Sequence, residues 1–186
     1  MQVFFNKICI LFALGFVFRT NLFSFNLLPT SILQKKMFTI KKITAAATYP
    51  IRHAILRKGE ALEKCIYPGD DSDLHSHFGL FEETELVGVV SVYQTKNPLF
   101  TDEKQFQIRG MAVLDNHQKK GYGAALLQHA ESYLKREAHY TIWFNARIVA
   151  IEFYKKMDFI QIGEPYEIDT IGVHYTMYKK ENGVST

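Results

Sequence analysis

The stretch "DNHQKKGYGAALL" (Asp115–Leu127) places a glycine on each side of a tyrosine, between a lysine pair and a run that reads as a helix. Glycine weakens the interior of a helix or strand, but it suits a place where the backbone turns tightly or approaches another group closely. The first N–H groups of a helix have no partner within it, and the helix dipole favours negative charge there. The segment therefore predicts an anion-binding turn at the start of a helix.

Three known anion-binding motifs can be compared with this turn. A P-loop requires lysine and then serine or threonine directly after its second glycine, but Ala124 and Ala125 follow Gly123. A dinucleotide-binding Rossmann turn requires a third glycine, where this chain has Leu126, and an acid after the next strand, where Phe144–Asn145 offers none. The third motif is Gln-x-x-Gly-x-Gly after a bulged strand, and this chain matches it.

The segment before the turn, "QFQIRGMAVL", changes the phase of its apolar residues. Phe106 and Ile108 lie on even positions, whereas Met111 and Val113, after Gly110, lie on odd ones. Side chains alternate between the two faces of a strand, so one face can collect both pairs only if an extra residue is inserted. We therefore expect a β-bulge at or near Gly110, which would leave backbone groups free for a ligand. A strand buried on both faces is the alternative, because phase does not matter there.

The remaining body predicts a mixed α/β fold. The apolar periodicity and the turn residues divide it into the following elements: strands over 37–43, 75–83, 85–94, 105–114, 140–145, 159–163 and 172–180, and helices over 48–59, 124–139 and 146–157. The short polar turn after residue 83 predicts an antiparallel hairpin. The strand–helix–strand order of 105–145 predicts a parallel pair.

Residues 1–36 differ in kind from the rest of the chain. The apolar run "ICILFALGFVF" (Ile8–Phe18) is short for a membrane span and resembles the apolar region of a signal peptide or a short anchor. The chain could also start at Met37, with the upstream residues a mis-assigned extension. We therefore divide the chain into a hydrophobic N-terminal extension, 1–36, and one domain, 37–186.

Charge and cysteine content limit the partners of that domain. Four of the 22 Lys and Arg residues and none of the 19 Asp and Glu residues lie in residues 1–36, so 18 basic residues face 19 acidic ones from Met37 onward. A nearly neutral body predicts no nucleic-acid partner. Cys65 is the single cysteine of the body, which argues against a disulfide framework and for a reducing compartment.

A second motif accompanies the glycine turn. The segment "NARIVAIEFYKKMDF" (Asn145–Phe159) matches the block Asn-x-x-x-x-Ala-x-x-Phe-Tyr-x-Lys-x-Gly-Phe except at Asp158, where glycine is usual. With both motifs, the body from Met37 to Lys180 resembles the GNAT superfamily of N-acetyltransferases, and within it a small bacterial-type subgroup of unassigned acceptor. Asp158 would then end a helix in the left-handed conformation, at some cost.

The resemblance implies a GNAT-type fold, a central mixed and partly splayed sheet flanked by helices, and acetyl-CoA as co-substrate. In that family the glycine turn holds the pyrophosphate and the bulged strand pairs with the pantetheine arm. Carried over to this sequence, the binding residues are Met111, Ala112, Val113, Gln118, Lys119, Lys120, Gly121, Tyr122, Gly123, Ala124 and Asn145. Lys119 and Lys120 would act mainly through their backbone N–H groups.

The same resemblance implies a direct attack of an amine on the thioester. Tyr154 matches the family's general acid, and a backbone N–H at Met111 or Val113 could stabilise the oxyanion. We choose His174 as the candidate base, on the open face of the last strand. The segment "DDSDLHSH" (Asp70–His77) invites a metal interpretation, but its spacing fits no standard site and we expect no metal. Glu82 and Glu85 read as solvated turn residues.

The sequence thus predicts a cytoplasmic N-acetyltransferase that moves an acetyl group from acetyl-CoA to a primary amine. The acceptor is a small molecule or a peptide, and acids in the loops 66–74 and 164–172 hint at a cationic amine. A homodimer is compatible with the sequence, and membrane contact is expected only if residues 1–36 are retained. A non-catalytic acyl-CoA-binding sensory domain is the alternative function, followed by a Rossmann-like dinucleotide binder.

Overall fold

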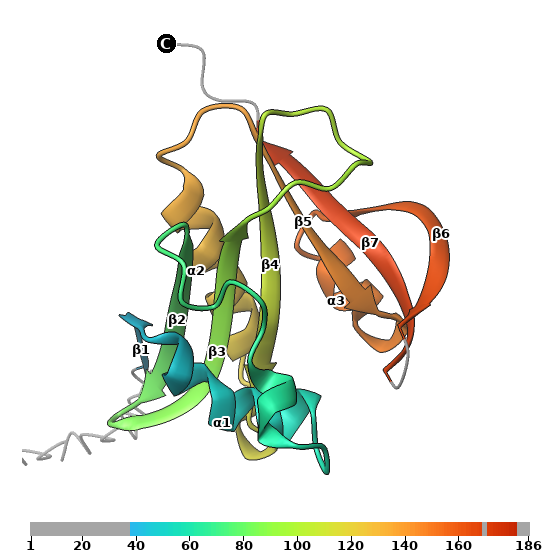
Figure 1. Cartoon of the computed structure of the whole chain (residues 1–186). Helices are drawn as coiled ribbons and strands as arrows, with labels where there is room; N and C mark the ends of the chain where they lie inside the picture. The colour runs from blue at the N-terminus through green and yellow to red at the C-terminus, as the bar shows by residue number, and fades with distance from the viewer. Residues whose placement is uncertain (1–37, 169–170, 182–186) are drawn as a thin grey trace, which may run out of the picture. The chain divides into compact units, whose positions relative to one another are not determined.

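The computed structural model describes residues 38–168 and 171–181, and the expectations for residues 1–36 lie outside them. A seven-stranded sheet in the order β1-β2-β3-β4-β5-β7-β6 forms the centre of the domain (Figure 1). Its strands are β1 (Phe38–Ile43), β2 (His75–Glu82), β3 (Glu85–Gln94), β4 (Lys104–Val113), β5 (Tyr140–Arg147), β6 (Ile160–Ile168) and β7 (Gly172–Glu181). Only β4 and β5 pair in parallel, so the mixed sheet, the antiparallel hairpin and the parallel pair are all confirmed.

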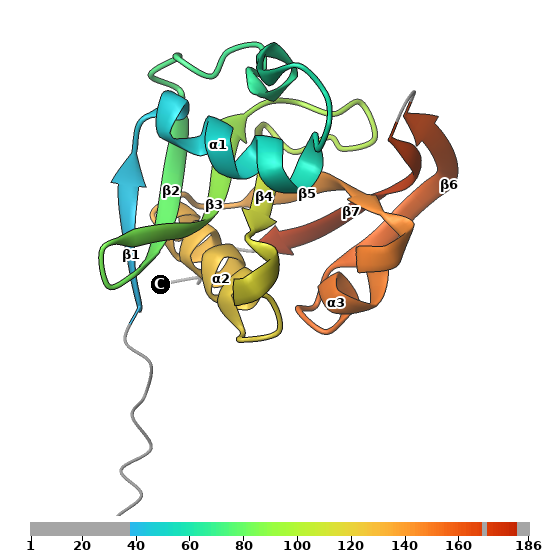
Figure 2. The same ribbon diagram turned by 90° about the horizontal axis from the view of Figure 1, so that it is seen from below.

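The helices cover both faces of this sheet (Figure 2). They are α1 (Ala45–Leu56), α2 (Tyr122–Leu134) and the short α3 (Ile151–Lys155), with 3₁₀ turns over Leu62–Cys65, Asp115–His117 and Ile148–Ala150. The larger core lies under α2, where Leu126 and Leu127 pack on the sheet, and a smaller one lies under α1 around Ile51 and Val89. None of the helices described is long and apolar enough to cross a membrane.

The bounds of α1 and α2 differ from the predicted 48–59 and 124–139 at both ends. Helix α1 begins three residues early because Thr44 caps it, its Oγ1 accepting the N–H of Ala47 at 3.3 Å, and Pro50 lies inside the helix. Helix α2 ends at Leu134, the last residue of its buried stripe, and not at residue 139. The sequence after Leu134 still favours a helix, but a further turn would have no buried surface to pack against.

The C-terminal elements also differ. The helix predicted over 146–157 is confined to the 3₁₀ turn and α3, because Ala146 and Arg147 extend β5 and pair with Tyr175 and His174 of β7. Strand β6 runs to Ile168 for the same reason, since it pairs with the other edge of β7. Pairing with a distant strand overrides local periodicity here.

The bulge at Gly110 is confirmed. In the β3–β4 ladder Ser91 faces Arg109 and Val89 faces Ala112, so Gly110 and Met111 share the space opposite one residue. Gly110 has φ +56°, a conformation that suits glycine. A Cβ at this position would also lie 2.6 Å from Arg52 Nε, so the close approach of a second chain segment requires glycine as well.

The splayed sheet is confirmed too. Strands β4 and β5 pair only over Lys104–Gln107 and Tyr140–Trp143, and beyond these residues the two strands diverge (Figure 1). From Ile108 onward, the edge of β4 that faces β5 carries no ladder within the described residues. The divergence opens the middle of the sheet beside the bulge of β4.

Candidate active site

A cavity of about 260 Å³ lies where β4 and β5 separate. Strands β4, β5 and β7, the end of α1, the loop at Tyr67 and the start of α3 contribute to its wall. Its described lining consists of Leu56, Arg57, Tyr67, Gln107, Ile108, Arg109, Gly110, Met111, Phe144, Asn145, Arg147, Val149, Ala150, Tyr154, Ile168, Ile171 and His174. The lining includes the bulge and both residues predicted to be catalytic.

The glycine turn follows directly from the end of β4. Gly121 caps α2 with φ +83°, and Lys119 also has a left-handed φ of +59°. This geometry turns the chain so that the first N–H groups of α2, which lack intrahelical partners, point out of the helix start. A Cβ at Gly121 would meet nothing within 4 Å, whereas one at Gly123 would touch the ring of Phe153 at 3.6 Å. The turn can therefore cradle an anionic group such as a pyrophosphate.

Two turn residues have side chains engaged elsewhere. Gln118 Nε2 donates to Val113 O and Asp115 Oδ1, both at 3.0 Å, so it braces the turn against the end of β4. Tyr122 is buried, and its ring lies 5.3 Å from that of Phe38. Tyr122 could thus contribute to anion binding only through its backbone.

Tyr154 stands in an aromatic cluster at the cavity wall. Its ring centroid lies 4.3 Å from that of Phe144 and 5.0 Å from that of Phe153. Burial raises the pKa of the Tyr154 hydroxyl to about 12, so this group keeps its proton at neutral pH. A hydroxyl of this kind suits a proton donor and not a base.

The prediction that His174 lies on an open face is wrong. Its side chain is 4% exposed, because β6 and β5 flank β7 on both edges and the ring of Tyr166 stacks on it at 6.4 Å. The ring nevertheless lines the cavity. Its Nδ1 lies 2.7 Å from Gly172 O, and since a carbonyl can only accept, Nδ1–H is the donor. In the neutral ring Nε2 then carries the lone pair that a base needs.

The comparisons with known proteins agree with this geometry. A sequence model described as the Acetyltransferase (GNAT) family matches residues 44–159, which include the bulge, the glycine turn and Tyr154. This chain belongs to the GNAT acetyltransferase family. The Rossmann alternative is therefore wrong, as the mixed sheet already indicates.

Relatives of this GNAT chain support the same assignment. YitI of Bacillus subtilis, an uncharacterized N-acetyltransferase, is 35% identical over 143 residues, which cover 77% of this chain and 96% of YitI. The ribosomal-protein-S18-alanine N-acetyltransferase from Escherichia coli superposes with a TM-score of 0.63 at 19% identity, covering 81% of this chain and 99% of that one. Arabidopsis thaliana NAA60, solved in complex with a bisubstrate analogue, superposes with a TM-score of 0.62 at 16% identity. The match covers 79% of this chain and 99% of that one. At these identities the two structures establish the shared fold alone.

An acid that sequence reasoning took as solvated braces the glycine turn of the GNAT chain. Glu82, at the end of β2, accepts from His117 Nδ1 at 2.7 Å, and its carboxylate lies 3.7 Å from Lys120 Nζ. The hairpin of β2 and β3 is thus tied to the turn by charge. No pattern in the sequence joins residues this far apart.

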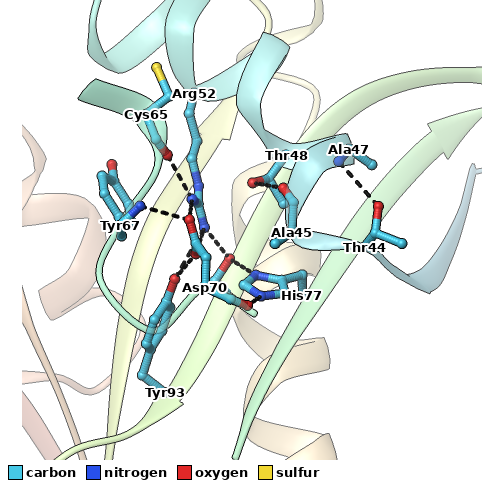
Figure 3. A network of polar contacts seen from close by, with 11 residues as sticks. Thr44, Ala45, Ala47, Thr48, Arg52, Cys65, Tyr67, Asp70, His77 and Tyr93 are labelled. Carbon is cyan, nitrogen blue, oxygen red and sulfur yellow. Dashed lines mark hydrogen bonds and ion pairs between the residues drawn. The ribbon is translucent and has the colours of Figure 1, made fainter. Parts of the chain in front are cut away.

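A buried polar network beneath the cavity was also not predicted (Figure 3). Arg52 of α1 has no exposed surface, and its guanidinium donates to Asp70 Oδ2 at 2.7 Å, Cys65 O at 2.9 Å and Ser91 Oγ at 2.8 Å. Burial by itself would raise the pKa of Asp70, but hydrogen bonds from Arg52 and from the hydroxyl of Tyr93 outweigh it and hold that pKa below its usual value. A buried ion pair is tolerated when its remaining donors and acceptors are satisfied in this way.

His77 completes the network and uses both of its ring nitrogens in it. Its Nε2–H donates to Asp70 O at 2.8 Å, and its Nδ1 accepts from Ser91 Oγ at 2.7 Å. Burial lowers the pKa of His77, with the hydrogen bond to Asp70 as a smaller opposing effect. Within residues 38–168 and 171–181 no three His, Cys, Asp or Glu side chains gather as metal ligands would.

Tyr67 connects this network to the cavity. Its ring lies 4.3 Å from the guanidinium carbon of Arg52 and 4.5 Å from that of Arg109, so it contacts two cations. Arg109 also lies 5.2 Å from the ring of Tyr93. No carboxylate pairs with Arg109 among the described residues, and its guanidinium lies against aromatic rings at the cavity wall.

Proposed function

We propose that this GNAT chain transfers the acetyl group of acetyl-CoA to a primary amine by direct attack within a ternary complex. One observation carries the proposal: the bulged strand β4 lines the cavity at Gly110 and Met111 and then leads directly into the anion-binding turn. One continuous segment thus offers sites for the two ends of a long, phosphate-bearing thioester. Family membership supports acetyl-CoA as the donor.

The residues fit this co-substrate. The turn from Gln118 to Ala124 supplies backbone N–H groups and two exposed lysines for the pyrophosphate. The open edge of β4 at Met111, Ala112 and Val113 supplies strand-like donors and acceptors for the amide groups of the pantetheine arm. Asn145, which is exposed and lines the cavity, offers a further polar contact.

Acetyl-CoA would supply the thioester carbonyl, at which the C–N bond forms and the C–S bond breaks. In this proposal His174 Nε2, which keeps its lone pair when Nδ1–H donates to Gly172 O, accepts the proton that the acceptor ammonium must lose. A free N–H of β4 at Met111 or Val113 stabilises the oxyanion. Tyr154 gives its proton to the leaving thiolate, and the second proton that the attacking nitrogen loses on forming the amide restores the Tyr154 hydroxyl through solvent. The proton taken by His174 passes to solvent, so the reaction releases one proton per turnover.

Binding of the co-substrate can be tested by calorimetry on the full chain and on Gly121→Glu. A carboxylate in the turn should repel the pyrophosphate and abolish detectable binding. The matched control is Gly59→Glu, because both glycines have φ +83° and open space around an added Cβ. Equal binding by the wild type and Gly121→Glu would contradict the assignment of the turn.

Catalysis by Tyr154 can be tested with Tyr154→Phe. General acids contribute about 10²–10⁴-fold, so we expect kcat to fall by at least about 10²-fold while acetyl-CoA binding persists. Tyr140→Phe is the matched control, because burial also raises the pKa of Tyr140 to about 12 but this residue does not line the cavity. Tight acetyl-CoA binding without transfer to any amine would instead support the non-catalytic sensory domain.

A further inference from the structure

The cavity carries an unusual balance of charge. Arg57, Arg109 and Arg147 line it, and no Asp or Glu occurs among the described lining residues. The hint of a cationic acceptor, drawn from acids in the neighbouring loops, is therefore not supported. Asp70 forms a buried ion pair with Arg52, and Glu164 and Glu167 are exposed residues outside the cavity lining.

Arg109 is held ready to bind an anion. Its guanidinium lies over the rings of Tyr67 and Tyr93, and these contacts use none of its N–H donors. No carboxylate of the described residues forms an ion pair with it. Arg109 therefore keeps its N–H donors available at the cavity wall.

Arg147, at the end of β5, is held by a hydrogen bond instead of by aromatic rings. Its Nη2 donates to Leu56 O at 3.1 Å, which fixes the guanidinium and leaves further donors unused in the described part of the chain. Arg57 adds a third charge, balanced only by Glu60 at 4.0 Å, the outer limit of an ion pair. At least two guanidinium groups thus face the cavity without a described counter-charge.

We propose that the acceptor amine carries an anionic group, a carboxylate or a phosphate, that Arg109 and Arg147 bind. This inference deepens the proposed function and rests on it for the identity of the acceptor as an amine. Guanidinium groups bind these planar or tetrahedral oxyanions through paired, charge-assisted hydrogen bonds. The same charges repel diamines and other polycations, which gives the site its selectivity.

The first experiment compares matched acceptors at saturating acetyl-CoA. The pairs are alanine with alaninamide and phosphoethanolamine with ethanolamine, and putrescine serves as a dication. We expect the anionic member of at least one pair to have a kcat/KM at least about ten-fold higher, which is the selectivity expected from one charge-assisted hydrogen bond. The amine of alaninamide is less basic than that of alanine, so a larger fraction of it is unprotonated near neutral pH. A preference for alanine therefore cannot arise from a larger supply of free amine. The preferred pair distinguishes carboxylate from phosphate.

The second experiment assigns the preference to residues. Arg109→Gln and Arg147→Gln should each raise KM for the preferred anionic amine by about ten-fold while the Kd for acetyl-CoA stays unchanged. Arg109→Lys and Arg147→Lys should restore part of the loss, since they return the charge without the planar fork. Arg136→Gln, an exposed arginine outside this cavity, is the control. Two positions in different strands guard against a folding defect in either variant.

Several outcomes would overturn the inference. A neutral amide or putrescine that reacts as well as the anionic amine would do so, and so would glutamine variants that keep the wild-type preference. Asp169 lies outside the described residues but between cavity-lining neighbours in sequence, so Asp169→Asn belongs in the set. A preference for acids that exists only in Asp169→Asn would also count against the inference. If the chain fails to bind acetyl-CoA, the proposed function fails, yet calorimetry with alanine and alaninamide still decides whether the cavity selects an anion.

Discussion

Gly110 meets two requirements at one position. Its φ of +56° inserts the extra residue of the bulge, and its missing side chain lets Arg52 approach to the distance at which a Cβ would collide with Nε. The residue therefore joins the bent strand at the cavity to the buried network beneath it.

We expect Gly110→Ala to destabilise the chain by about 2–4 kcal/mol, the sum of the left-handed backbone cost and the cost of overpacking. Gly59→Ala has a similar backbone strain with nothing within 4 Å of the added Cβ, so it should cost only about 1–2 kcal/mol. Urea unfolding of both variants measures the difference. Equal losses would show that the contact with Arg52 does not constrain this position.

Asp158 has a strained backbone conformation close to Tyr154 in the sequence. It has φ +65° just after α3, where Phe159 N–H bonds to Tyr154 O at 3.1 Å and ends the helix. The sequence predicted this conformation from the glycine that is usual in the motif, and the structure confirms it.

Asp158→Gly should raise the free energy of unfolding by about 0.5–1 kcal/mol, because glycine adopts this conformation without steric cost. Asp73→Gly, at an exposed loop position without a positive φ, should be neutral or destabilising. Chemical denaturation compares the two. A loss of stability in Asp158→Gly would mean that the aspartate side chain contributes more than its backbone strain costs.

At the scale of elements, the hairpin of β2 and β3 supports the anion-binding turn. Glu82 bonds to His117 and lies near Lys120, so the orientation of the turn depends on a strand that the co-substrate need not touch. We therefore expect this side chain to affect acetyl-CoA binding by positioning His117 and Lys120.

Glu82→Gln should raise KM for acetyl-CoA about two- to ten-fold and change kcat little, because it weakens charged contacts that are partly buried. Glu85→Gln provides the control, because Glu85 faces Glu82 across the same hairpin turn and its side chain is exposed. Initial-rate measurements over a range of acetyl-CoA concentrations separate the two parameters. A fall in kcat alone would place the role of Glu82 in the chemical step.

At the scale of the whole molecule, the network of Arg52, Asp70 and His77 ties α1, the loop before β2 and the central strands together (Figure 3). The pKa of His77 is lowered in the folded state, so the unfolded chain binds more protons below the ordinary histidine pKa of about 6.5. The stabilising contribution is present above that pH and is lost as the pH falls through the folded pKa.

We therefore expect the free energy of unfolding to fall as the pH is lowered from about 7.5 to 5, and His77→Gln to flatten that slope. His129, whose pKa burial also lowers, should keep part of the slope, whereas His139→Gln, at an exposed position, should leave it intact. Urea titrations at several pH values measure the slope directly. If His77→Gln has the same slope as the wild type, then the protonation of His77 does not contribute to the pH dependence of the free energy of unfolding.

The local parts of the fold and site were predictable because neighbouring residues encode them. The bulge follows from the phase change around Gly110, the helix start from the glycines of the turn, and Tyr154 from a motif that lies within one segment. Boundaries failed where a distant strand or the edge of the core decided them, as at Leu134 and Arg147.

The charge and burial of the cavity depend on contacts across the chain. Arg52 bonds to Ser91, 39 residues away, and Arg147 bonds to Leu56, 91 residues away, so no local pattern reports either contact. Sequence alone assigned acids of the loops to the acceptor, but the fold turns Asp70 inward and brings arginines from β4, β5 and α1 to the cavity. Local chemistry thus specified the bulge and the turn that we expect to bind the donor, whereas the cavity that we propose for the acceptor exists only after long-range packing brings its walls together.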